Sequence, residues 1–206
     1  MRHGRGAGAI LAAVLLAGLT GCADRPNDLE TYYDTAPVSP SARPPSPAPN
    51  TAAAPSADPA ATAQHAIAGQ VTAAVLTKDD LAREGVRAAS TPIESGACFA
   101  AVPSGDPRGA SWTYASGSSL LQQVTGYLDR TAGDVLAEVQ CDGQKLTFPL
   151  PSGAESVRGW CQGTTCTVLL AGGHVLSGLQ VTASSAGRAT EAAKSLVPLA
   201  AKKLPA

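Results

Sequence analysis

Proline is concentrated in one stretch of this sequence, and that stretch limits which part of the chain can fold. Nine of the sixteen prolines lie in residues 26–59, where Leu29 and Val38 are the only branched aliphatic residues. Such a segment cannot bury enough apolar surface to offset the entropy lost on ordering it. We therefore expect residues 22–64 to form a Pro/Ala-rich disordered tether, and residues 65–206 to form one folded domain of ordinary size.

The N-terminus has the three parts of a secretory signal. Arg2 and Arg5 precede an uncharged, largely apolar run over residues 7–19, which ends in small residues. This order is typical of a signal peptide, and the run is shorter than the roughly 18–20 residues that a membrane-spanning helix needs. The sequence predicts a signal peptide over residues 1–21 and export of the remainder.

The end of this run is more specific, because Leu19-Thr20-Gly21-Cys22 resembles the lipobox of bacterial lipoproteins. The resemblance implies that a diacylglyceryl group is attached to the sulfur of Cys22 and that cleavage makes this residue the N-terminus of a lipoprotein. Two or more acyl chains hold a protein stably on a membrane, whereas a single chain does so only marginally. We expect the protein to be anchored through Cys22 to the extracytoplasmic face of the cell membrane.

Four further cysteines lie in the predicted domain, at Cys98, Cys141, Cys161 and Cys166. An even number in an exported domain indicates two disulfides, and four cysteines allow three pairings. We favour Cys161–Cys166, which closes the short loop CQGTTC, together with Cys98–Cys141. In the chain-entropy model the longer loop stabilises the fold by roughly 4 kcal/mol and the shorter one by about 2 kcal/mol.

Hydrophobic periodicity and turn signals give a coarse fold for residues 65–206. Thr77 and Asp80 have the spacing of a helix capping box, and Pro198 should kink the last helix. Helices are predicted over 77–85, 118–133 and 184–204. Strands and hairpins are predicted over 96–103, 110–116, 134–150 (turning at Asp142-Gly143) and 166–183 (turning at Gly172-Gly173). The expected class is α+β, a mostly antiparallel sheet with helices packed on one face.

The sequence offers little for catalysis, so we predict that the protein is not an enzyme and has no catalytic, cofactor-binding or metal-ligating residues. Beyond the first residue of the domain, His174 is the only histidine, and no GxSxG motif accompanies it. Asp129, Asp134 and Glu138 would need an apolar pocket to act as a carboxylate pair, and we favour solvated acids.

Three aromatic residues offer the clearest alternative to a purely structural role. Trp112, Tyr114 and Trp160 would form a partner surface if they gathered on one side of the sheet. The domain is poor in other bulky residues, so we favour a role in its core. The formal net charge of -1 argues against binding to nucleic acid, which requires a basic face.

The layout as a whole, a lipobox, a Pro/Ala-rich tether and a two-disulfide α+β domain, resembles small actinobacterial lipoproteins of the CseA type. This resemblance implies an accessory protein that restrains cell-envelope-stress signalling in concert with a sensor kinase, whose outer domain would be the partner. The alternative is a binding module for a lipid or cell-wall fragment. A deep apolar cavity would favour the ligand binder, and a filled core with one exposed patch would favour the partner-binding protein.

Overall fold

The computed structural model describes residues 58–103, 105 and 107–205, which all belong to the same structural unit of the chain. The predicted signal peptide, the lipid attachment at Cys22 and the tether up to residue 57 lie outside the described residues. The tether was expected to continue to residue 64, but a helix begins at Pro59, where Asp58 accepts a hydrogen bond from the backbone N–H of Ala60 at 3.0 Å. Proline at the first helical position is favourable, because its missing N–H would have no partner there.

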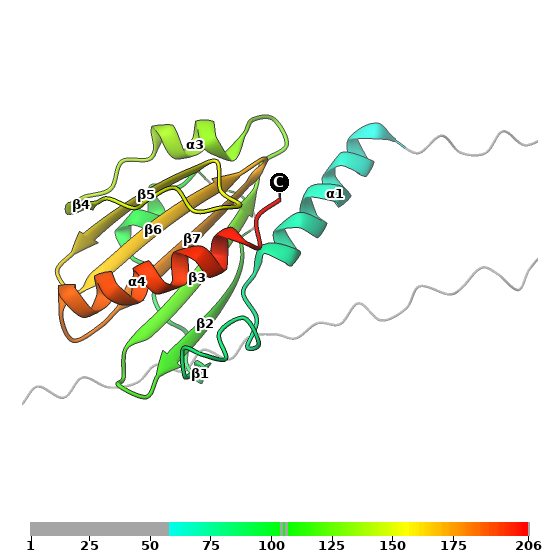
Figure 1. The fold of residues 1–206 in the computed structure, drawn as a ribbon. Helices are drawn as coiled ribbons and strands as arrows, with labels where there is room; N and C mark the ends of the chain where they lie inside the picture. Colours follow the sequence, from blue (N-terminus) through cyan, green and yellow to red (C-terminus); the bar gives the residue numbers. More distant parts are fainter. Residues whose placement is uncertain (1–57, 104, 106, 206) are drawn as a thin grey trace, which may run out of the picture. The chain divides into compact units, whose positions relative to one another are not determined.

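Seven antiparallel strands form one sheet, in the order β1-β2-β3-β7-β6-β5-β4 (Figure 1). The strands are β1 (Val86–Ala88), β2 (Arg108–Tyr114), β3 (Ser119–Gly126), β4 (Gln144–Leu146), β5 (Ser156–Gln162), β6 (Thr165–Gly172) and β7 (Val175–Thr182). The expected α+β class with an antiparallel sheet is confirmed. Strands β6 and β7 are buried along almost their whole length, and they form the centre of the sheet.

Helices cover both faces of this sheet, whereas the sequence suggested one. The helices are α1 (Pro59–Ala74), α2 (Ala97–Ala100), α3 (Ala132–Glu138) and α4 (Ala186–Ala201). Alternate residues of β6 enter different apolar clusters, Val168 with α4 and Leu169 with α2 and α3. We call the face packed against α1 and α4 the α4 face, and the opposite one the α3 face. Central strands with two apolar faces require a layer on each side.

The α4 face carries the larger part of the core. Ser185 begins α4 by accepting a hydrogen bond from Arg188 N–H. Pro198 lies inside the helix, and the kink expected at this residue stays a prediction. Its buried side chains recur at helical spacing: Ala189, Ala193, Leu196, Val197, Ala200 and Ala201. This amphipathic stripe explains why the C-terminal helix could be predicted from the sequence.

The predicted helix over 118–133 is wrong, because the first half of this segment forms β3. Leu120, Gln122 and Val124 are fully buried at every second position and pack toward the α4 face. β3 pairs with β2 on one side and with β7 on the other. Period-two burial between two neighbouring strands outweighs the helical spacing that the apolar residues also allow.

The predicted hairpin over 134–150 is also wrong in its first half, which forms α3. Thr131 accepts a hydrogen bond from Asp134 N–H at the start of this helix, at 3.1 Å. Val135, Leu136 and Val139 then lie on one buried helical stripe. The cap and this stripe outweigh the alternation that suggested a strand, and only the short β4 follows Asp142-Gly143.

The predictions for two shorter segments also differ from the structure. The segment 96–103 forms α2 rather than a strand, and its Phe99 packs so closely over β7 that a Cβ at Gly178 would clash with the ring. The segment 77–85 forms turns rather than a regular helix. The expected capping box is nevertheless present, since Thr77 N donates to Asp80 Oδ2 at 2.8 Å and Asp80 N donates to Thr77 Oγ1 at 3.4 Å.

The hairpin over 166–183 is confirmed, as β6 and β7 are joined at a tight turn. Gly172 pairs with Val175, so the turn residues are Gly173 and His174, one position later than expected. Gly173 has a φ of 53°, a conformation that glycine adopts without the steric cost of a side chain. The strand predicted over 110–116 is also found, as the second half of β2.

Candidate functional site

Both disulfides pair as favoured from the sequence, and they lie on different faces of the sheet. Cys161 and Cys166 face each other across β5 and β6, with Cα atoms 4.1 Å apart, and both are buried in the cluster on the α4 face. Cys98 of α2 and Cys141, which follows α3, have Cα atoms 5.0 Å apart and are half-buried. The second disulfide lies on the α3 face, at the wall of a groove.

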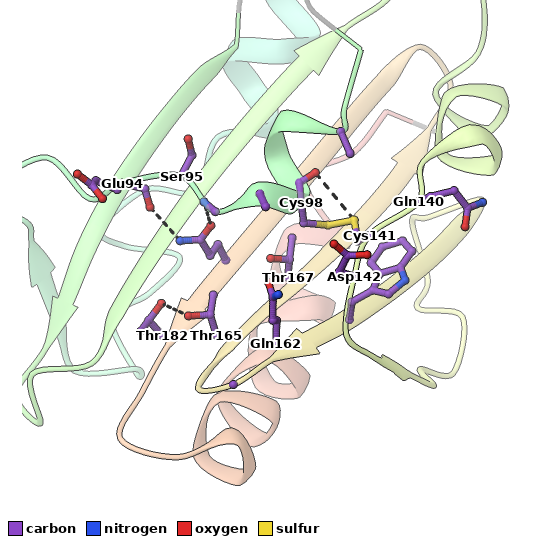
Figure 2. Close-up of a pocket in the computed structure, with 16 residues that line it drawn as sticks. Glu94, Ser95, Cys98, Gln140, Cys141, Asp142, Gln162, Thr165, Thr167 and Thr182 are labelled. Carbon is purple, nitrogen blue, oxygen red and sulfur yellow. Dashed lines mark hydrogen bonds between the residues drawn. A yellow bond between two sulfur atoms is a disulfide. The ribbon is translucent and has the colours of Figure 1, made fainter.

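This groove, which we call the polar groove, has a volume of about 610 Å³ and lies over one end of β5, β6 and β7 (Figure 2). Cross-strand pairing builds its floor, because residues paired on neighbouring antiparallel strands point to the same face. The floor consists of two such rows, Trp160–Thr167–Gln180 and Gln162–Thr165–Thr182. Further along the same face the sheet is apolar and is covered by α2 and α3. The polar groove is therefore a part of the α3 face that the helices leave open.

Gln180 attaches one wall of the groove to the sheet. Its side-chain Oε1 accepts from Gly96 N–H at 2.5 Å, and its Nε2 donates to the Glu94 carbonyl at 3.0 Å. The Cys98–Cys141 disulfide then joins α2 to the segment after α3, which forms the opposite wall (Figure 2). Because Gln180 is only 4% exposed and both ends of its amide are bonded, this part of the groove is preorganised.

Thr167 occupies the middle of the floor, between Trp160 and Gln180 on the neighbouring strands. It is 5% exposed, and no hydrogen bond joins its hydroxyl to the other residues that line the groove (Figure 2). Thr165 and Thr182 differ, because their hydroxyls lie 3.0 Å apart and bond to each other. Thr167 thus presents an unused donor and acceptor to whatever fills the groove.

Charge in the polar groove has one sign. Among the described residues that line it, the charged side chains are Glu94 and Asp142, and both residues are exposed. Figure 2 shows Asp142 beside the Cys98–Cys141 disulfide and Glu94 at the other side of the groove. The floor is neutral, and its buried row contains the indole of Trp160, the hydroxyl of Thr167 and the amide of Gln180. This arrangement disfavours anions and offers hydrogen bonds at the deepest point.

A second surface lies beside α4, and we call it the α4 patch. It is a mainly apolar hollow of about 340 Å³, in which Lys194 and Lys202 are the charged residues. Its apolar lining comes from Phe148, Pro149, Pro151, Val197 and Pro198. The neighbouring Leu150 is 61% exposed, although leucine is usually buried.

The candidate catalytic residues have structural roles. The Nδ1 of His174 lies 3.0 Å from the carbonyl oxygens of Tyr127 and Arg130, so it donates to them and holds the β6–β7 turn against the segment that follows β3. Asp134 accepts from Thr131 Oγ1 at 2.7 Å, and Glu138 pairs with Arg130 at 3.0 Å. Trp112 and Trp160 are each 5% exposed, in clusters on opposite faces, which agrees with a role in the core.

Tyr114 is the most perturbed titratable group. Burial, and secondly the nearby Glu84, raise the pKa of its phenol to about 12. Its hydroxyl is buried without a hydrogen-bond partner among the described residues. A phenol in this state remains protonated at any physiological pH, and it lies on the α4 face, apart from the polar groove.

The described residues contain no group of three or more His, Cys, Asp or Glu side chains that could hold a metal ion. Over the same part of the chain, none of the helices is long and apolar enough to cross a membrane. The sequence alone did not point to Gln180 or Thr167, because the segments that frame them were assigned to the wrong elements. The alternation within 166–183 was the available signal, since it places Thr167 and Gln180 on the less apolar side of a hairpin.

No family model, curated protein or solved structure matches this chain.

Proposed function

We propose that this chain is a non-enzymatic lipoprotein, anchored through Cys22 on the extracytoplasmic face of the cell membrane, that restrains cell-envelope-stress signalling. It does so by binding the outer domain of a sensor kinase or another envelope protein. The observation that supports this proposal is the α4 patch, a mainly apolar surface hollow beside the buried core of the α4 face. Exposed apolar hollows with a polar rim are typical of protein interaction sites.

The composition of the α4 patch indicates the kind of partner. Lys194 and Lys202 stand at an apolar surface formed largely by proline and phenylalanine. A complementary partner would place an apolar side chain in the hollow and acidic residues against the two ammonium groups. Anchoring both proteins to one membrane raises their effective concentration toward the millimolar range, so a weak contact would be sufficient.

A reporter of envelope-stress transcription tests the proposal in living cells. Basal reporter activity should rise on deletion of the gene, and Cys22→Ala should have the same effect, because a protein released from the membrane is diluted. Leu150→Asp should also raise it, since the new carboxylate lies where the partner is expected to be apolar and acidic. Leu128→Asp is the matched control, because Leu128 is a similarly exposed leucine (54%) that lines a different hollow, beside Ile67 and Val71 of α1, and it should leave the reporter unchanged.

The proposal would be rejected by equal basal activity in the wild-type, deletion and Cys22→Ala strains. If Leu128→Asp and Leu150→Asp had equal effects, the α4 patch would not be the contact surface. The polar groove favours a second candidate function, the binding of a cell-wall fragment, because it is concave and its floor can form hydrogen bonds.

A further inference from the structure

We infer that the polar groove binds an uncharged, hydroxyl-rich ligand, namely a neutral saccharide. This inference deepens the second candidate function and is independent of the regulatory proposal, because the polar groove and the α4 patch lie on opposite faces of the sheet. The volume of about 610 Å³ is within the range of small-ligand sites. Three features of the groove determine the class of ligand.

The first feature is the neutral floor. The deepest polar side chains, Thr167 and Gln180, are 5% and 4% exposed, and neither carries a charge. A ligand group that replaces water above them must form hydrogen bonds but must not bring an unpaired charge, since burying a charge without a partner is costly. Hydroxyl and acetamido groups meet both conditions.

The second feature is the sign of the charges at the margin. Glu94 and Asp142 are exposed carboxylates, and no basic residue lines the groove within the part of the chain that the structure describes. Carboxylates repel phosphate, sulfate and uronate groups, whereas they accept hydrogen bonds from hydroxyls. Anionic polymers and lipid headgroups are therefore disfavoured, and neutral sugars are accepted.

The third feature is the backbone of the floor. β6 pairs with β5 and with β7 along its length, so its backbone N–H and C=O groups are already bonded. A peptide cannot add to this sheet as a further strand at the groove, because that mode of binding needs a free edge. Side chains must recognise the ligand, and the hydroxyl and amide groups of the floor can form hydrogen bonds with the O–H groups of a sugar ring.

The hydroxyl of Thr167, which is not bonded to the other residues lining the groove, provides the sharpest test. Thr167→Val keeps the shape and the strand preference of the side chain but removes the donor and acceptor, so it should weaken saccharide binding about tenfold. Thr125→Val is the matched control, because Thr125 is also a buried strand threonine (7% exposed) but does not line the polar groove. Gln162→Ala, at an exposed position of the floor, should weaken binding severalfold without affecting the fold.

The experiment is a calorimetric titration of the purified full-length chain and its variants with four tetramers. Two are neutral, one of N-acetylglucosamine and one of glucose, while a galacturonate tetramer is anionic and tetralysine is cationic. We expect saturable binding of at least one neutral tetramer, weakened by Thr167→Val and by Gln162→Ala but not by Thr125→Val. The midpoint of thermal unfolding of each variant verifies that it is folded.

Failure of both neutral tetramers to bind would overturn the inference, as would equal affinities of the wild type and Thr167→Val. Stronger binding of tetralysine than of the neutral tetramers would assign the groove to a cationic peptide. This outcome would overturn the inference of a saccharide ligand, although it is compatible with a peptide ligand from the cell wall. None of these outcomes bears on the reporter assay, so failure of this inference and failure of the regulatory proposal are distinguishable.

Discussion

The two faces of the central strands use the same backbone for different purposes. On the α4 face, Val168, Leu170, Leu179 and Val181 are completely buried under a sixteen-residue helix. On the α3 face, the shorter helices α2 and α3 cover only part of the sheet, and the polar groove lies over another part. Side chains alternate between faces along a strand, so a single hairpin can build a closed core on one side and an open binding surface on the other.

Two glutamines show the same contrast in their hydrogen bonds. Gln122 is fully buried on the α4 face, where its amide accepts from Leu76 N–H at 2.7 Å and donates to the Ala74 carbonyl at 3.1 Å and to Ser177 Oγ at 3.0 Å. Gln180 makes the equivalent attachment on the α3 face, to the segment at Glu94 and Gly96. One glutamine closes the core and the other supports the wall of a groove. Buried amides of this kind fix the position of the backbone segments to which they bond, because a buried amide without hydrogen bonds would lower the stability of the fold.

The two disulfides give the largest expected difference between the faces. Replacing Cys98 and Cys141 together by alanine opens a loop with a sequence separation of 43 and should lower the free energy of unfolding by about 4 kcal/mol. Replacing Cys161 and Cys166 together by alanine opens a loop with a sequence separation of only 5. In the same chain-entropy model this change should lower the free energy of unfolding by about 2 kcal/mol. Urea denaturation of both double variants measures the difference.

Exposure predicts a second difference between these disulfides. In the native protein Cys98–Cys141 should be reduced first by a small thiol, because it is half-buried at the groove, whereas Cys161–Cys166 is buried beneath α4. Alkylation followed by peptide mapping identifies which cysteines have become free. Simultaneous reduction of both disulfides would contradict the contrast between an open and a closed face.

The filled core of the α4 face predicts the next largest effect. Leu196 of α4 is 0% exposed within this core, so Leu196→Ala should lower the free energy of unfolding by about 3 kcal/mol through the lost contacts and the cavity that remains. Leu150→Ala removes the same atoms from a side chain that is 61% exposed and should change stability by less than about 0.5 kcal/mol. Chemical denaturation compares the two, and a small loss for Leu196→Ala would mean that the α4 face is loosely packed.

A smaller effect is expected at the end of the α4 face, where Asp80 pairs with Lys203 at 3.2 Å. Burial acts to raise the pKa of Asp80, but hydrogen bonds from Thr77 and the Lys203 ammonium together hold it below its ordinary value of 3.8. A depressed pKa in the folded state stabilises the fold above pH 3.8, and this stability is lost as the pH falls through the folded pKa. Asp80→Asn should therefore cost about 1 kcal/mol at pH 7, and the difference from the wild type should shrink in strong acid.

The control for this pH dependence is Asp79→Asn, at the exposed neighbouring position. It should change stability by less than about 0.5 kcal/mol at either pH. Urea denaturation at pH 7 and below pH 3.8 measures both variants. A difference between Asp80→Asn and the wild type that stayed constant with pH would show that the ionised carboxylate is not the stabilising form.

The polar groove could be predicted from the sequence only in part. The alternation of apolar residues within 166–183 was sufficient to predict the β6–β7 hairpin, and the short spacing of Cys161 and Cys166 was sufficient to predict their disulfide. The walls of the groove could not be predicted, because 96–103 and 134–140 have apolar patterns that fit a strand as well as a short helix. The secondary structure of a short apolar run is ambiguous until the segments that pack against it are known.

The sequence by itself determined the properties that depend on composition and local pattern. These are the proline-rich segment, the amphipathic α4 and the β6–β7 hairpin. The signal peptide and the lipobox at Cys22 stay predictions from the sequence. Tertiary structure decided whether 118–126 became a strand, because pairing with β2 and β7 requires neighbours that lie elsewhere in the chain. It also placed Thr167 between Trp160 and Gln180. Local periodicity fixes which side chains share a face, but only the packing of distant segments fixes what covers that face and what remains open.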